Sequence, residues 1–198
     1  AIGGGSLLIG VLIGVALGTW AALRQNSVAD YVVMFVGNTG SAFPSFVIGP
    51  VLILVFAIWL KVAPAGGWND FDPRYMMLPM ALLVFIHVGT IGRVMRGSMI
   101  EVLHSNFIRT ARAKGLPMRT VVLRHAIKPA LLPVVSLIGP MAISSITAAV
   151  VTESVFSIPG LGKLIVNGAA NRDYTLVLGL VVLVTVIADI FNLLVDLA

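Results

Sequence analysis

The stretch IGGGSLLIGVLIGVALGTWAAL, residues 2–23, contains no charged side chain. A helix needs about 20 predominantly apolar residues to cross a bilayer, so this stretch is long enough. Four further stretches that are almost free of charge follow, at about residues 31–60, 75–92, 129–152 and 174–197. The sequence therefore predicts an all-α, polytopic membrane protein in which residues 1–198 form one domain of five transmembrane helices.

The composition of the whole chain agrees with this assignment. Hydrophobic residues make up 59% of the 198 residues and charged residues only 11%, against ~25% charged in soluble domains. A soluble fold of this size leaves too much surface exposed to hide so many apolar side chains, and disorder requires the opposite composition. The chain has no cysteine, which excludes disulfides and thiolate metal sites.

Lys and Arg residues are divided unevenly between the two sides of the predicted membrane. Five helices place nine of them in the loops of one side and four in the loops of the other. Because cytoplasmic loops carry the basic excess, we expect residue 1 outside and residue 198 inside. The chain starts apolar, without Met or the basic segment of a signal peptide, so we also expect that a preceding helix is missing.

Glycines recur at every fourth residue of the first predicted helix, at Gly10, Gly14 and Gly18. Such a stripe lets the backbone of a neighbouring helix approach closely. The alternative is a chance spacing in a glycine-rich membrane helix. We expect these three residues to form a helix-packing surface.

Ionisable groups inside a membrane span usually face protein and pair with one another. Asp189 lies about two turns from the predicted cytoplasmic end of the last span, and Arg93 and Arg96 end the third span on the same side. We expect one of these arginines to neutralise Asp189. His87, in the third span, is expected to be a hydrogen-bonded packing residue, because no second ligand stands at metal-binding spacing.

The outer segment 153–173 follows the fourth span and is expected to contain a short interfacial helix after Pro159. This helix would contact a binding protein, gate a cavity or simply lie on lipid. Glu153 would face water, contact peptide amino groups or tie the segment in place. Ser144, Ser145 and Thr147 would line the pathway or bond back to their own helix. We retain Glu153 and these three hydroxyls as candidate pathway or gate residues.

The basic segment 104–128 lies between the third and fourth spans. Its pattern predicts two short helices separated by a corner, with Gly115 as a left-handed helix cap and Pro117 opening the second helix. Basic residues suit lipid headgroups. Nucleic-acid binding is disfavoured, because Phe107 is the only aromatic residue available for base stacking. The small residues Ala111, Ala113 and Gly115 instead favour insertion into a groove of another protein.

Two motifs in this region resemble a known family. They are FIRTARAKGLP, residues 107–117, and LRHAIKPALLP, residues 123–133. Both are similar to the EAA motif of ABC-importer permeases, with Arg109-Thr110-Ala111 where the general form has Glu-Ala-Ala. This variant, together with RGSMIEVL (96–103), VTESVFSIPGLG (151–162) and NRDY (171–174), resembles the oligopeptide and dipeptide branch of the family.

The resemblance implies a permease subunit of a type I ABC importer in the bacterial inner membrane, with oligopeptides as the expected cargo. It implies a sister permease subunit, two cytoplasmic ATP-binding subunits and a periplasmic or lipid-anchored substrate-binding protein as partners, besides membrane lipid. ATP and Mg²⁺ would bind the ATPase subunits, and no cofactor, metal or nucleic acid would bind this chain. The residues expected to couple to the ATPase are Arg109, Thr110, Ala111, Arg112, Ala113, Lys114, Gly115, Leu116 and Pro117.

No catalytic residue is predicted. The nearest match to a phosphate-binding loop, PGLGKL at residues 159–164, has Ser157 in place of the first glycine and lacks the Ser or Thr after Lys163. Related cargoes on the same scaffold, namely dipeptides, nickel chelates or glutathione, remain alternatives. An ion-coupled secondary transporter is disfavoured, because it needs midplane ion sites and internal repeats.

Overall fold

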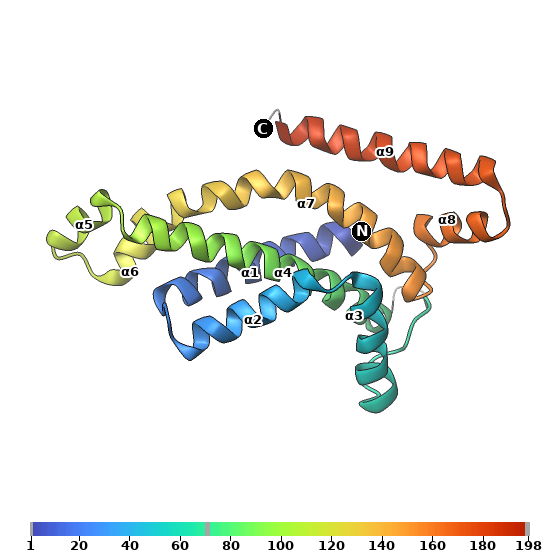
Figure 1. Cartoon of the computed structure of the whole chain (residues 1–198), viewed down its shortest axis with the longest axis horizontal. Coiled ribbons are helices and arrows are strands. Elements are labelled where there is room, and N and C mark those ends of the chain that lie inside the picture. Colours follow the sequence, from blue (N-terminus) through green and yellow to red (C-terminus); the bar gives the residue numbers. More distant parts are fainter. Residues whose placement is uncertain (1, 70–71, 197–198) are drawn as a thin grey trace. The chain divides into compact units, whose positions relative to one another are not determined.

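The computed structural model describes residues 2–69 and 72–196, and these residues form helices and no strand (Figure 1). This confirms the predicted all-α fold. The elements are α1 (Ile2–Leu23), α2 (Val28–Ala42), α3 (Ser45–Leu52), the π-helix η1 (Ile53–Trp59), α4 (Pro73–Leu103), α5 (Asn106–Ala113), α6 (Met118–Thr120), the π-helix η2 (Val121–Ala126), α7 (Ile127–Val155), α8 (Leu161–Ala170) and α9 (Tyr174–Asp196).

The number of membrane spans differs from the predicted five. Among the described residues, three helical stretches are long and apolar enough to cross a membrane: Ile2–Leu23, Pro73–Leu103 and Met118–Ser145. The stretches Val28–Gly40 and Ser45–Trp59 add a fourth if they count as one broken span. α9 is 23 residues long, and the described stretch Tyr174–Ile187 within it is apolar. The count of five is therefore not confirmed.

The second predicted span, residues 31–60, is interrupted next to Pro44. α2 ends at Ala42, and Pro44 precedes α3 with an extended backbone, at φ −60° and ψ 145°. A proline disfavours the helical conformation of the residue before it, which explains the break at Phe43. Pro50 lies inside α3, and the π-helix η1 follows three residues later.

Residues that lie close together group into two compact units. The first contains Ala1–Leu8, Phe43–Phe85 and Gly139–Ala198, and the second contains Ile9–Ala42 and Ile86–Ile138. Both candidate sites described below lie inside single units. The segment with the two predicted short helices belongs to the second unit, and the outer segment belongs to the first.

In the second unit, the three spaced glycines of α1 lie against α4. A Cβ atom on Gly14 would lie 2.8 Å from the Cβ of Ile91, and one on Gly18 would lie 2.5 Å from the carbonyl oxygen of Gly92. A Cβ on Gly10 would collide with the side chain of His87, which is buried. The missing side chains therefore let α1 approach α4 more closely than any larger residue would allow.

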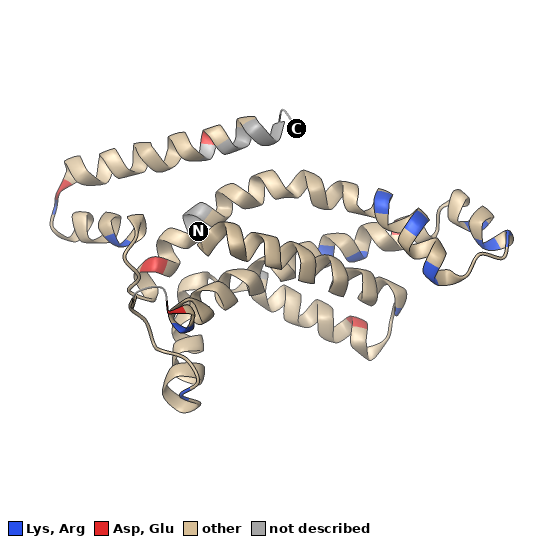
Figure 2. Ribbon diagram, turned by 180° about the vertical axis from the view of Figure 1, so that it is seen from behind, with Lys and Arg blue, Asp and Glu red and all other residues tan. Residues whose placement is uncertain are grey.

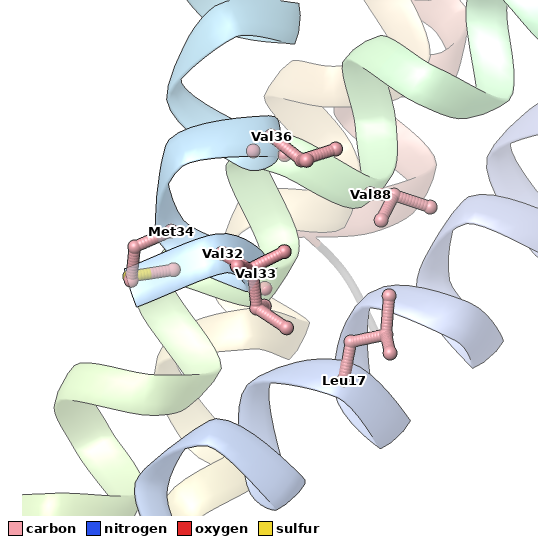
Figure 3. A pocket seen from close by; sticks show the side chains of 9 residues that line it. Leu17, Val32, Val33, Met34, Val36 and Val88 are labelled. Carbon is pink, nitrogen blue, oxygen red and sulfur yellow. The ribbon is translucent and has the colours of Figure 1, made fainter. Parts of the chain in front are cut away.

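The helices α2 and α4 also meet through glycine. A Cβ atom on Gly89 would overlap the carbonyl oxygen of Gly37, so the two backbones are in direct contact. Beside this contact lies an apolar pocket of about 220 Å³ between α1, α2 and α4 (Figure 3). Leu17, Val33 and Val88 contribute to its wall. Because none of the described residues in that wall carries a charged or polar side chain, the pocket suits only an apolar group.

Arg96 of α4 forms an ion pair with a different partner from the one predicted. Its Nε and Nη2 atoms donate to Oδ1 and Oδ2 of Asp30 in the first turn of α2, at 2.5 and 2.6 Å. Arg96 thus pairs with Asp30 rather than with Asp189, because α2 and α4 pack together and bring the two groups within reach. Asp189 is exposed on α9, and its pairing with Arg93 stays a prediction.

Candidate functional site

The elbow, defined as residues 104–128, projects beyond the end of α4 as two short helical pieces (Figure 1). α5 ends at Ala113, and Gly115 follows with φ +74°, the left-handed conformation expected of a helix cap. The N–H of Gly115 donates to the carbonyl of Arg112 at 2.9 Å. Pro117 then precedes α6, and its carbonyl accepts the N–H of Thr120 at 2.9 Å.

One face of α5 packs on η2 within the elbow. Ile108 and Ala111 are buried, as are Val121, Val122 and Ala126. The small size of Ala111 suits this packing inside the chain, and its predicted contact with another protein stays a prediction. Ala113, two residues further on, is exposed.

The other face of the elbow is exposed and combines apolar and basic side chains. Phe107 is 51% exposed and Met118 45%. Figure 2 shows Lys and Arg residues gathered on this part of the chain. The exposed basic residues of the elbow include Arg109, Arg112, Lys114 and Arg119. An apolar patch with a basic border suits a groove with an acidic border on another protein.

The effect of substituting Gly115 should depend on the backbone conformation that the new residue prefers, not on its size. A Cβ atom added to Gly115 would have no neighbour within 4 Å. We expect Gly115→Ala to destabilise the elbow by about 1 kcal/mol, since alanine disfavours positive φ, and Gly115→Asn to cost less. Protease cleavage between Lys114 and Arg119 would measure this. Equal cleavage of both variants and the wild type would contradict the assignment of Gly115 as a cap.

Glu153, at the end of α7, caps the next helix. Its Oε2 atom accepts the N–H of Gly162 at 2.8 Å, in the first turn of α8. A Cβ atom on Gly160 would collide with this carboxylate, and one on Gly162 would collide with the backbone of Val150. A carboxylate is favourable at the positive N-terminal end of a helix. Of the three roles considered for Glu153, this geometry supports tying the outer segment in place.

α8 rests on its neighbours through glycine rather than through its apolar residues. Gly162 and Gly168 are buried, and a Cβ on Gly168 would lie 3.0 Å from Cγ2 of Val177 on α9. Leu164 and Val166 are each 47% exposed. α8 therefore presents an apolar surface outward, as an interfacial helix would.

The predicted pathway residues Ser144 and Ser145 differ in burial. Ser144 is exposed and donates to the carbonyl of Pro140 at 3.0 Å. Ser145 is buried and donates to the carbonyl of Met141 at 2.6 Å. Both bond back to their own helix, the alternative left open above. Ser145 also lines a cavity together with Glu153, whereas the side chain of Thr147 lies outside the described part of the chain.

Sequence reasoning missed two features of these sites. Asp30 could have been proposed as a partner of Arg96, since it lies on the same predicted side of the membrane and directly precedes an uncharged stretch. Nothing in the sequence indicated the cavity beside Glu153, because residues far apart in the sequence line it.

Within the described residues, no three His, Asp or Glu side chains lie close enough together to hold a metal ion.

Comparison with known proteins identifies relatives over nearly the whole chain. The family described as "Binding-protein-dependent transport system inner membrane component" matches residues 14–198. The oligopeptide transport system permease protein OppB of Haemophilus influenzae is 56% identical over 186 residues, which cover 94% of this chain and 61% of that protein.

Two further relatives extend the comparison. OppB of Salmonella typhimurium is 55% identical over 183 residues, 92% of this chain and 60% of that protein. The dipeptide transport system permease protein DppB of Bacillus subtilis is 40% identical over 193 residues, 98% of this chain and 62% of that protein. The chain thus spans about three fifths of the length of these curated relatives.

Proposed function

Because the chain belongs to the family of binding-protein-dependent transport system inner membrane components, we propose that it is part of a permease subunit of an ATP-driven peptide importer. Oligopeptides are the favoured cargo, because the relatives with about 55% identity are named oligopeptide permeases, whereas the dipeptide permease is 40% identical. Multiple apolar helices support a multi-pass position in the bacterial inner membrane.

The proposed subunit works with a sister permease, two cytoplasmic ATPases and an external binding protein. ATP and Mg²⁺ bind the ATPases, and this chain transmits their movement. The elbow faces the cytoplasm, and its exposed face docks on an ATPase subunit. The observation that carries this assignment is the division of the elbow into a face buried on its own chain and an exposed apolar and basic face.

The division of the elbow permits a direct test of docking with a matched pair of variants. The 198 residues contain no cysteine, so Ala113→Cys and Ala111→Cys each introduce one thiol into this segment. Ala113 is exposed and Ala111 is buried on its own chain. We expect the Ala113→Cys thiol to react rapidly in the separate subunit, to be protected in the assembled complex and to cross-link to the ATPase.

The Ala111→Cys variant serves as the control, because its thiol should react slowly in both states. Labelling with a membrane-impermeant maleimide on inverted vesicles, followed by mass spectrometry, measures both reactions. Unchanged reactivity of Ala113→Cys after the ATPases bind, in a complex that imports peptide, would contradict the docking role.

A further inference from the structure

The first unit contains a cavity of about 610 Å³ with a carboxylate in its wall. Its volume lies within the ~300–1,000 Å³ that small-molecule sites occupy. The wall is formed by the start of α1, by Trp68 and Met76, and by residues of α7, α8 and α9. Most of these side chains are apolar, among them Ala149, Leu161 and Val184. Of the described residues that line the cavity, only Glu153 is charged.

The side chain of Glu153 has unused capacity for hydrogen bonding. An ionised carboxylate offers about four acceptor positions, and within the described part of the chain Oε2 accepts one N–H, from Gly162. Among the described residues, no Lys or Arg lines the cavity, and none forms an ion pair with Glu153. The N-terminal end of α8 offers this carboxylate only about half a unit of positive charge. A cationic group that enters the cavity would supply an ion-pair partner.

The wall of the cavity is held in place by backbone contacts. The N–H of Gly67 donates to the carbonyl of Phe156 at 2.8 Å, which positions the neighbouring Trp68. A Cβ on Gly66 would lie 2.5 Å from the same carbonyl oxygen. Ser145 adds a second polar side chain, eight residues before Glu153 on α7 and so about 12 Å away along the helix axis. Backbone contacts therefore fix the part of the wall that carries Trp68.

We propose that this cavity binds the N-terminal residue of a peptide during translocation, an inference that rests on the proposed function. The α-ammonium group pairs with the Glu153 carboxylate, and an apolar first side chain lies against Ala149, Leu161 and Val184. An acyl chain of a lipid would use only the apolar wall, and an anionic headgroup would be repelled by Glu153. The charge thus favours a group with an ammonium ion over an acyl chain or an anionic headgroup, and the comparison with an N-acetylated peptide below tests whether a peptide supplies it.

Glu153→Gln separates binding from capping. Glutamine keeps a side-chain oxygen that can accept the N–H of Gly162, so α8 stays capped, but the negative charge is removed. Asp173→Asn is the matched control: Asp173 caps α9, where its Oδ1 accepts the N–H of Leu176 at 3.1 Å, and it is exposed outside the cavity. Both variants remove one carboxylate charge from a helix N-terminus in the outer segment.

The assay uses the full-length subunit in the assembled transporter in proteoliposomes, with ATP-dependent import measured in the same vesicles. The probe is a peptide whose first residue carries a benzophenone side chain, compared with its N-acetylated twin. We expect the free-amine peptide to label this subunit near Ala149 or Leu161, and Glu153→Gln to lower that labelling about tenfold. Asp173→Asn should leave labelling by the free-amine peptide at the wild-type level. The acetylated peptide should label Glu153→Gln and Asp173→Asn equally weakly.

Equal labelling by both peptides would overturn the proposal and would indicate a purely apolar cavity of the kind that lipid fills. Labelling of Glu153→Gln by the free-amine peptide at the wild-type level would also overturn it. Labelling that maps elsewhere while the wild type imports peptide would overturn the inference and leave the proposed function standing. Absence of ATP-dependent import with all partners assembled would instead refute the proposed function.

Discussion

Replacing Arg96 by methionine should destabilise the second unit by about 3 kcal/mol, since removing one partner of a buried ion pair leaves an uncompensated charge. The side chain of Asp30 is 2% exposed and that of Arg96 26%, so the remaining carboxylate would lose its cation while staying buried. Asp30 also accepts the N–H of Asn26 at 3.0 Å. The Arg96 pair therefore stabilises both α2 and the turn that precedes it.

A double-mutant cycle distinguishes the charge effect from lost packing. Asp30→Asn in the Arg96→Met background removes the orphaned charge yet keeps an oxygen that can accept the N–H of Asn26. We expect the double variant to recover most of the stability lost in Arg96→Met, as measured by denaturant titration of the full-length subunit in mixed micelles. Additive losses would show that the two side chains do not interact in the folded protein.

Substituting Gly89 should have the second large effect. A Cβ atom there would meet the carbonyl oxygen of Gly37, which is backbone and cannot rotate away. Gly89→Ala must therefore push α2 and α4 apart, and overpacking of this kind typically costs about 1–3 kcal/mol. The melting temperature of the purified subunit should fall accordingly.

Gly97 provides the control on the same helix, because apart from its own helix backbone and its two chain neighbours no atom lies within 4 Å of a Cβ placed there. Gly97→Ala should be neutral or should stabilise α4 by about 0.5–1 kcal/mol, the usual difference between alanine and glycine inside a helix. If Gly89→Ala were as stable as Gly97→Ala, the direct contact of the α2 and α4 backbones would be refuted.

Features that depend on neighbouring residues were predictable from the sequence. The apolar stretches predicted the helices, and Gly115 followed by Pro117 predicted the corner of the elbow. Each of these follows from hydrophobicity or from the backbone limits of one residue type. The family was also recognisable, because its motifs lie in continuous segments of the chain.

Contacts between distant segments had to come from the fold. Nothing local to Arg96 distinguishes Asp30 from Asp189 as its partner, and only the packing of α2 on α4 brings Asp30 within 2.5 Å. Likewise, Ala111 and Ala113 have the same side chain, but the rotation of α5 on η2 buries one and exposes the other. Composition and spacing determined that this chain is a helical membrane protein with a basic elbow. Which side chains pair, face inward or share a cavity was decided by tertiary packing, because these contacts join residues whose separation along the chain carries no information about their distance in space.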